Sequence, residues 1–420
     1  MNFKTKRILV LLVIVLAYWI SFFNRSLTTP TLPLLIKDWG MTMAGAGAIA
    51  SIMLFTYSLG HIPFGILADK FGRSKFMLLG TAVVGVANFL MSLTTSFSSF
   101  LGLRAFVGLG AAANHAPLMA MVTDWFPAKR RGLAMGVLAI VSTAGPLTAL
   151  LWGQFAIGKW GGWQPVYAYT IVPAVVIVVL ALLFAKDPNA EDKKRIHEEE
   201  LQDEKEYGVS PKIEQSHHVP WTTILKTSIA HKELWVLYIS WFFIMSEFTI
   251  LLHFLPTMLV KLRGVPVTDA IFMTTGWLWT GLVVSILGGW LSDRFKSRKW
   301  FTFFGVIPAH IIVMAIPFIP VSMIFPMLCV MGVFWFGTSG AYYTLSADVC
   351  GRANPALMAT LLGISIVFAD LGGVFGAQIS GYLGDKLGVG SMFWVAGIIG
   401  ILFCLSLLFL PETAKKSAKA

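Results

Sequence analysis

The stretch GILADKFGRSK, at residues 65–75, returns as GWLSDRFKSRK at residues 289–299, so the two copies lie 224 residues apart. Glycine matches are common in a chain with 39 glycines, but acidic and amide matches in the same order are not. An internal repeat of this size indicates two related halves. Further identical pairs at the same offset are Gly40/Gly264, Gly108/Gly332, Asp124/Asp348 and Gln154/Gln378.

The composition indicates that the repeated unit consists of membrane-spanning helices. Of the 420 residues, 56% are hydrophobic and only 13% are charged, with a mean hydropathy of +0.75. Soluble domains carry about 25% charged residues, and a membrane-spanning helix needs about 20 mostly apolar residues. Twelve such segments predict an all-α polytopic membrane protein with twelve transmembrane helices in two pseudo-symmetric six-helix bundles. They begin near residues 8, 44, 76, 97, 132, 166, 233, 270, 300, 324, 356 and 391.

The net charge of +11 reflects membrane topology rather than a nucleic-acid surface. Short connections on one side of the predicted membrane hold seventeen Lys and Arg residues, and those on the other side hold five. Basic residues accumulate in cytoplasmic loops. We therefore expect both termini in the cytoplasm, a multi-pass protein of the plasma (cytoplasmic or inner) membrane, and no nucleic-acid partner.

The chain divides at one change of composition. We predict an N-terminal six-helix bundle at residues 1–185 and a C-terminal bundle with a short basic tail at 232–420. Residues 186–231 form a charged cytoplasmic linker in this prediction. Its sequence EDKKRIHEEELQDEKEYG is mixed in charge, and WTTILKTSIAHKE is typical of a short helix on a membrane surface.

A repeat of six helices is the sequence sign of a secondary transporter, whose substrate site lies between the halves near the midplane. No Walker loop, HExxH motif, nucleophile elbow or His/Cys cluster is present in the sequence. We therefore expect no enzyme activity, no cofactor and no metal. The expected partners are a small molecule, protons and the lipid bilayer, and we expect a monomer.

The repeated block resembles the loop 2–3 signature of the major facilitator superfamily, and RAFVGLG at residues 104–110 resembles the fourth-helix motif of that superfamily. Within that superfamily, the sequence most resembles the anion:cation symporters and the organic-acid transporters. Those relatives carry acids where this chain has Asn24 and Ala111.

The resemblance implies that the charges of the repeated block take part in gating. In such transporters they link helix ends and stabilise the outward-facing state. A plainer alternative is that the charges only set topology, although this leaves Asp69 within its glycine frame unexplained. The second copy has Lys296 where the motif has glycine. The gating residues implied are Gly65, Asp69, Lys70, Gly72, Arg73, Asp293 and Arg294.

Ionisable residues inside predicted spans are the candidates for substrate binding, because a charge in the bilayer is costly and usually functional. Arg25 lies near the middle of the first span, at residues 8–36, on one helical stripe with Tyr18. An arginine fork suits a carboxylate or another planar anion. The alternative is a structural pair with an acid of a neighbouring helix.

The fourth span places Arg104 and His115 on one face, and Asn114 adjoins them. We expect Arg104 and Asn114 to bind substrate and His115 to bind substrate or carry a proton, since histidine titrates near neutrality. Hydrogen-bonded packing is the alternative for this lone histidine. On the tenth predicted helix, Trp335, Ser339 and Tyr342 form a stripe that suits a small organic anion or plain packing.

Proton coupling is assigned to acids within the second half. Glu247 lies at the centre of the seventh predicted helix, opposite Asn24 of the first half. Burial disfavours the charged form of a carboxylate, as a proton carrier requires. Pairing with Arg25 or Arg104 is the competing interpretation. Asp370, in the eleventh helix, either contributes to coupling or caps a helix break beside two glycines.

These features predict a secondary active transporter that couples protons to symport of a small organic anion, a monocarboxylate or sugar acid, by alternating access. One alternative is a proton-linked exporter or exchanger of a cationic or lipophilic solute. Another is a transport-dead receptor of the same fold, which would have no need of a gating block.

Overall fold

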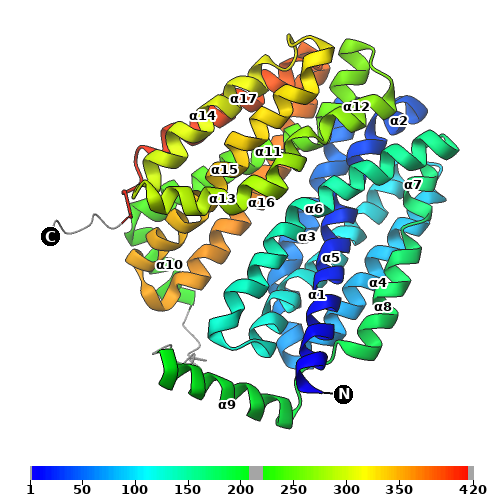
Figure 1. Cartoon of the computed structure of the whole chain (residues 1–420). Coiled ribbons are helices and arrows are strands. Elements are labelled where there is room, and N and C mark those ends of the chain that lie inside the picture. Colours follow the sequence, from blue (N-terminus) through cyan, green and yellow to red (C-terminus); the bar gives the residue numbers. More distant parts are fainter. Residues whose placement is uncertain (1, 208–220, 415–420) are drawn as a thin grey trace. The chain divides into compact units, whose positions relative to one another are not determined.

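The computed structural model describes residues 2–207 and 221–414, and Figure 1 shows the whole chain. Within the helices, the side chains at positions 128, 132, 204, 206, 207, 221, 286, 289, 293, 356 and 359 lie outside this description. The described residues form helices and connections, without a strand among them.

Ten helices in the described ranges are long and apolar enough to cross a membrane. Two shorter apolar helices, Lys299–Ala315 and Ser391–Leu407, bring the set to the twelve that the sequence predicts. The long central connection also contains the short helix expected there, at Trp221–Ala230. The predicted all-α, twelve-helix membrane architecture is thus confirmed.

The first of two compact units comprises Met1–Leu27, Phe55–Trp152 and Lys159–His217. Its helices are α1 (Phe3–Ser26), the later part of α3 (Met43–Phe71), α4 (Arg73–Ser92), α5 (Phe97–Trp125), most of α6 (Ala128–Trp160), α7 (Gln164–Ala168), α8 (Ile171–Phe184) and α9 (Ala190–Tyr207). We call it unit 1.

The second unit, unit 2, comprises Thr28–Leu54, Gly153–Gly158 and His218–Ala420. The domain boundaries proposed from the sequence stay a prediction. Besides the first part of α3, its helices are α2 (Thr28–Trp39), α10 (Trp221–Ala230), α11 (Lys232–Arg263), α12 (Val267–Thr274), α13 (Gly276–Arg294), α14 (Lys299–Ala315), α15 (Val321–Ala353), η1 (Pro355–Leu357), α16 (Met358–Leu387) and α17 (Ser391–Leu407).

The first predicted span is two helices rather than one, since α1 ends at Ser26 and α2 begins at Thr28. Pro30 explains the break, because proline has no backbone N–H to continue the hydrogen bonds of α1 but fits the first turn of a new helix. At the end of α1, the carbonyl oxygen of Asn24 accepts the backbone N–H of Leu27 at 3.4 Å, and its second lone pair can accept another donor. The last carbonyl groups of α1 matter for the site below.

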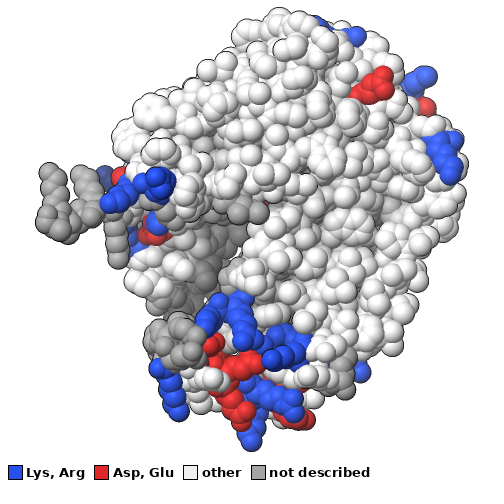
Figure 2. Space-filling view, viewed as in Figure 1, with Lys and Arg blue, Asp and Glu red and all other residues white. Residues whose placement is uncertain are grey.

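The charged stretch after α8 folds as the helix α9, which lies beside the N-terminal end of α1 (Figure 1). Arg7 of α1 donates to Glu199 at 2.8 Å, and Arg131 of α6 donates to Glu200 at 2.9 Å. Lys6 also pairs with Asp192. On the face shown in Figure 2, charged side chains gather over α9, while the flanks of the helices are almost free of charge. This part of the predicted linker is therefore tied to unit 1.

Candidate functional site: an arginine cluster and a buried acid–histidine pair

Arg104 holds the end of α1. Its buried guanidinium donates from Nη1 to the carbonyl oxygen of Asn24 at 2.9 Å and from Nη2 to that of Arg25 at 2.6 Å. Both carbonyls belong to the last turn of α1, next to the break before α2. The contacts give Arg104 a positioning role for Arg25, and its predicted role in substrate binding stays a prediction.

Amide side chains fix the same helices to one another. The Nδ2 group of Asn114 on α5 lies 3.0 Å from the carbonyl oxygen of Ala17, 2.8 Å from Ser21 Oγ and 3.3 Å from Thr81 Oγ1. Asn114 therefore joins α1, α4 and α5, and its amide hydrogens are used within the protein.

Asn24, at the position where the resembling transporters carry an acid, belongs to a second amide contact. Its Oδ1 accepts a hydrogen bond from Nδ2 of Asn88 at 2.5 Å, and its own Nδ2 donates to the carbonyl oxygen of Ile20 at 2.7 Å. Both amides are buried. A neutral, hydrogen-bonded pair thus occupies this place in unit 1.

Five side chains from three helices gather at Arg25, and we call them the Arg25 cluster: Tyr18, Arg25, Tyr57, His61 and His115. The Cζ atom of Arg25 lies 5.2 Å from the ring centroid of Tyr57, and the Tyr57 and His61 rings are 4.2 Å apart. The His61 and His115 rings are 5.3 Å apart, and the hydroxyl of Tyr18 lies 3.3 Å from Nε2 of His115.

The cluster joins predicted residues with residues that the sequence left unassigned. Tyr18, Arg25 and His115 were candidates from the sequence, whereas Tyr57 and His61 were not among them. Tyr57 and His61 are one helical turn apart on α3, so that spacing was the available signal. The structure thus brings a guanidinium, two phenols and two imidazoles together within unit 1.

Glu247 lies at the centre of α11 and is fully buried, as the sequence predicts. Its partner is His310 of α14, whose Nδ1 lies 3.0 Å from Oε1 and 2.8 Å from Oε2 of the carboxylate. His310 was not among the candidates from the sequence, because a lone histidine gives no periodic signal.

The wall around the Glu247–His310 pair comes from α15 and α17. A Cβ atom at Gly400 would lie 2.2 Å from Nδ1 of His310 and 2.5 Å from Oε2 of Glu247, so only glycine leaves room for the pair. The rings of Trp335 and Phe403 lie 5.8 and 6.1 Å from the imidazole of His310. An acid and an imidazole therefore share a closely packed, largely aromatic site in unit 2.

The stripe on α15 divides in the structure. Trp335 faces the Glu247–His310 pair, and the hydroxyl of Tyr342 lies 2.6 Å from Ser240 Oγ of α11. Ser339 donates to the carbonyl oxygen of Phe336 in its own helix. Asp370 is buried in the middle of α16, which runs unbroken from Met358 to Leu387, so the helix break considered for this residue does not occur.

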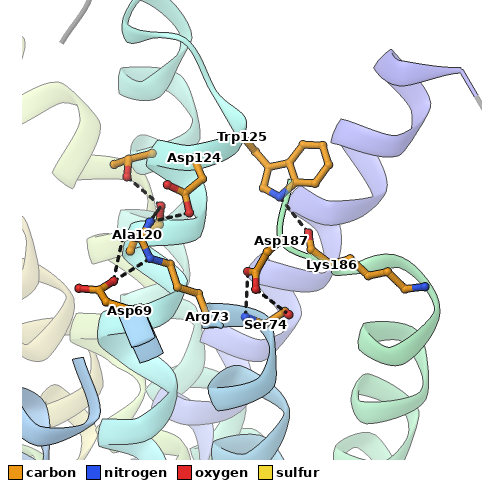
Figure 3. A network of polar contacts seen from close by, with 9 residues as sticks. Asp69, Arg73, Ser74, Ala120, Asp124, Trp125, Lys186 and Asp187 are labelled. Atoms are coloured by element: carbon orange, nitrogen blue, oxygen red, sulfur yellow. Dashed lines mark hydrogen bonds and ion pairs between the residues drawn. The ribbon is translucent and has the colours of Figure 1, made fainter. Parts of the chain in front are cut away.

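The first copy of the repeated block contains an ion-pair network, which Figure 3 shows from close by. Arg73 pairs with Asp69 at 2.9 Å and, through Nη1, with Asp124 of α5 at 2.5 Å. Asp187, which follows α8, accepts hydrogen bonds from the backbone N–H and the hydroxyl of Ser74. Asp187 is a network member that the sequence analysis did not name, and Asp124 was identified there only as a matched acid of the repeat.

The glycines of this block differ in what they do. Gly72 has a φ of +109°, a conformation that favours glycine over any residue with a Cβ atom. A Cβ at Gly65 would meet no atom within 4 Å among the described residues, so packing does not require a glycine at this position. Lys70 lies over the ring of Phe71.

The second copy repeats the network with a shift of one residue. Arg298 pairs with Asp348, the counterpart of Asp124, whereas Arg294 lies over the ring of Trp290. Glu412, after α17, accepts from the backbone N–H groups of Arg298 and Lys299 at 2.9 and 3.1 Å. The side chain of Asp293 lies outside the described residues.

Comparison with known proteins agrees with this architecture. The chain is 24% identical to a D-galactonate transporter of Escherichia coli O6:H1, over 98% of this chain and 97% of that protein. It is 27% identical to a niacin transporter of Acinetobacter baylyi, over 75% of this chain and 73% of that protein.

Among solved structures, a bacterial homolog to the human lysosomal transporter Spinster, in an inward-facing and unoccupied conformation, superposes with a TM-score of 0.77. It is 20% identical, and the match covers 97% of this chain and 98% of that one, which shows the fold. The family model described as the Major Facilitator Superfamily matches residues 14–377. The chain therefore belongs to the Major Facilitator Superfamily and is a multi-pass membrane transporter rather than an enzyme.

Proposed function

We propose that this transporter is a proton-coupled symporter for a small organic anion. The observation that carries the proposal is the buried contact between Glu247 and His310 in unit 2. A carboxylate and an imidazole at hydrogen-bond distance, both shielded from water, form a unit that gains or loses one proton. Such a unit is what a gradient-driven carrier needs.

The packing around the pair supports a role in proton exchange. Glu247 and His310 come from different helices, α11 and α14, and α17 contacts both through Gly400. Protonation of the carboxylate removes its attraction to a charged imidazole, so the contact between the two helices depends on the proton. We propose that this dependence links proton binding to the conformational change of unit 2.

The Arg25 cluster supplies the proposed recognition of the anion. A guanidinium offers a carboxylate two parallel hydrogen bonds, and its position over Tyr57 orients the plane of the fork. Arg104 fixes the backbone of Arg25 through the carbonyl groups of α1. In this proposal Arg104 positions the anion site and Arg25 contacts the anion.

Of the two anion classes expected from the sequence, the cluster favours a monocarboxylate with a flat body. The amide N–H groups of Asn24, Asn88 and Asn114 donate to protein acceptors, so they are engaged when no substrate is present. A sugar acid needs many polar partners for its hydroxyl groups. Aromatic and imidazole rings instead suit a planar apolar surface.

The relatives include carriers of both chemistries, since one is named for D-galactonate and the other for niacin. Both names denote organic acids, which supports the anion in the proposal. The distribution of Lys and Arg supports cytoplasmic termini, and the Arg73 and Arg298 networks would then act as gates on the cytoplasmic side.

The proposal is tested with purified protein in liposomes that carry an inward proton gradient. We expect uptake of radiolabelled nicotinate to exceed that of galactonate, and both to exceed uptake of neutral nicotinamide. Collapse of the gradient with a protonophore should abolish accumulation. Galactonate uptake above nicotinate uptake would overturn the preference for a flat body, and accumulation that ignores the gradient would overturn proton coupling.

A further inference from the structure

Unit 2 contains a cavity of about 700 Å³ at the end of the unit where the second copy of the repeated block meets the end of α15 and the segment after α17. Its charged lining consists of Lys296, Arg298, Arg352 and a single acid, Asp348. The cavity is separate from the Glu247–His310 pair, because the two share no lining residue.

The positive charges of this cavity exceed what carboxylates of the described residues neutralise. Asp348 pairs with Arg298. Arg352 donates weakly to the carbonyl oxygen of Glu412 at 3.4 Å, and neither Arg352 nor Lys296 forms an ion pair with a carboxylate in the described part of the chain. The carboxylate of Glu412 is already engaged by backbone N–H groups and by Ser297. Two cationic side chains are thus available to an anion.

The backbone of Lys296 is a second sign of a ligand site. Its φ is +51°, the one positive value at a non-glycine residue among the described positions. The counterpart in the first copy, Gly72, has a φ of +109° and no side chain. A residue with a Cβ atom is strained in this left-handed conformation, and glycine would relieve the strain at position 296. The chain nevertheless has a lysine there. Strain of this kind gathers at functional sites.

A buried hydroxyl gives a third observation. Thr413 lines the cavity and is 7% exposed, and its Oγ1 atom makes no hydrogen bond with the described residues. A buried polar atom without a partner is costly. An anion with several acceptor oxygens satisfies a hydroxyl donor and two cations together, and phosphate is the anion of that kind that proteins commonly bind with arginine and lysine.

The surroundings of the cavity indicate where such a phosphate comes from. Exposed aromatic side chains surround the second copy of the repeated block at Trp290, Phe295 and Trp300. Arg294 lies over the Trp290 ring and Lys299 over the Trp300 ring. Tryptophan next to basic residues is typical of the membrane–water interface, where lipid headgroups lie and basic pockets bind them.

We propose that this cavity binds a phosphate group, that of an anionic phospholipid headgroup, through Lys296, Arg352 and the hydroxyl of Thr413. The bound phosphate bridges the loop between α13 and α14 to the end of α15 and to the segment after α17. The site is independent of the transported substrate, since none of its residues belongs to the Arg25 cluster or to the Glu247–His310 pair.

The test is thermal unfolding of the purified full-length protein in detergent, titrated with dihexanoyl phosphatidylglycerol, dihexanoylglycerol or inorganic phosphate. A ligand that binds the folded state raises the unfolding temperature. We expect stabilisation by the phosphatidylglycerol and none by dihexanoylglycerol, which has the same tails and no phosphate. Stabilisation by inorganic phosphate as well supports the site and identifies a soluble source.

Variants make the test specific. Lys296→Gly and Arg352→Gln should each raise the phosphatidylglycerol concentration that gives half-maximal stabilisation by at least fivefold. Lys226→Gln, at an exposed position of α10, should leave this concentration unchanged. Lys296→Gly relieves backbone strain, so its unfolding temperature without lipid should equal or exceed that of the wild type. Unchanged midpoints in both cavity variants, or equal stabilisation by dihexanoylglycerol, would overturn the proposal.

Discussion

Two arginines that are equivalent by sequence criteria differ in the structure. Arg25 and Arg104 both lie inside membrane spans, but Arg104 is fully buried against the end of α1, whereas Arg25 is half-buried and lies over Tyr57. The difference depends on the carbonyl groups in the last turn of α1, which accept the hydrogen bonds of Arg104. Periodicity places a residue on a helix face, but it does not show which acceptors a neighbouring helix presents.

Arg25→Lys tests bidentate recognition, because lysine keeps the charge and loses the fork. We expect the Kd for a monocarboxylate to rise about tenfold, equivalent to loss of roughly 1.4 kcal/mol, which is close to the lower end for one hydrogen bond to a charged group, about 1.5–3 kcal/mol. Isothermal titration of the purified variants measures this change. Arg195→Lys, on α9, is the matched control. Binding within threefold of the wild type for both Arg25→Lys and Arg25→Gln would make Arg25 structural.

Gly400→Ala tests the fit of the Glu247–His310 pair. The added Cβ would lie 2.2 Å from the imidazole, so the pair must separate or α17 must shift. Overpacking of this kind costs about 1–3 kcal/mol, and we expect a lower unfolding temperature together with impaired proton-driven uptake. Gly363→Ala, on α16 of the same unit, is the control, since its Cβ meets nothing within 4 Å. Equal behaviour of the two variants would show that α17 yields without disturbing the pair.

At the scale of the elements, the repeat indicated part of the ion-pair networks. The matched acids Asp124 and Asp348 were visible in the sequence, and each accepts an arginine of its own copy. The pairing arginine of the second copy lies one residue beyond the aligned position, because Arg73 aligns with Ser297 at the common offset while the side chain that pairs with Asp348 is Arg298. A shift of one residue in a loop changes no hydrophobic pattern, so the sequence alone does not reveal it.

Glu412 provides a pH-dependent contact at the start of α14. Partial burial alone would raise the pKa of Glu412. Hydrogen bonds from the backbone N–H groups of Ala414 and Arg298 and from the hydroxyl of Ser297 outweigh this effect and hold the pKa of Glu412 below its ordinary value. A lowered folded-state pKa means that the stabilisation is present above the unfolded-state value and is lost as pH falls through the folded-state value.

Glu412→Gln should therefore lower the unfolding temperature at pH 7, by the equivalent of about 1 kcal/mol, the usual cost of a lost cap. Below the ordinary glutamate value of about 4.3 the difference from the wild type should shrink. Scanning fluorimetry across pH 3.5–8 measures both values. Glu198→Gln on α9 is the control, and a difference that stays constant down to the lowest pH would contradict the assignment.

Asp69→Asn tests gating at the level of the helix ends. The Asp69–Arg73 pair is exposed at Asp69, and such pairs contribute at most about 1 kcal/mol to stability. We therefore expect normal folding and measurable substrate binding, with an altered balance between inward- and outward-facing states. Labelling of single cysteines placed on each face reports this balance. Labelling rates equal to those of the wild type on both faces would count against a gating role.

For the whole molecule, hydropathy and the repeat were sufficient to predict the helical class and the twelve helices, and the resemblance of the repeated block to a known signature implied the superfamily. They were insufficient for the site, because it depends on contacts between helices that are distant in the chain. Glu247 became a candidate for proton coupling because it lies at the centre of a predicted membrane span. His310, 63 residues later, became visible only when α14 was placed beside α11. Substrate chemistry depends on such contacts, so the sequence left both a monocarboxylate and a sugar acid open.

The most direct test of proton coupling compares substrate counterflow with proton-driven uptake for Glu247→Gln in liposomes. Glutamine resembles the protonated carboxyl and retains a partner for His310, so binding and counterflow should survive, because neither requires release of the proton. Accumulation driven by a pH gradient should disappear, because the empty carrier can no longer return deprotonated. A Glu247→Gln protein that still accumulates substrate against its gradient would contradict a proton carrier at Glu247.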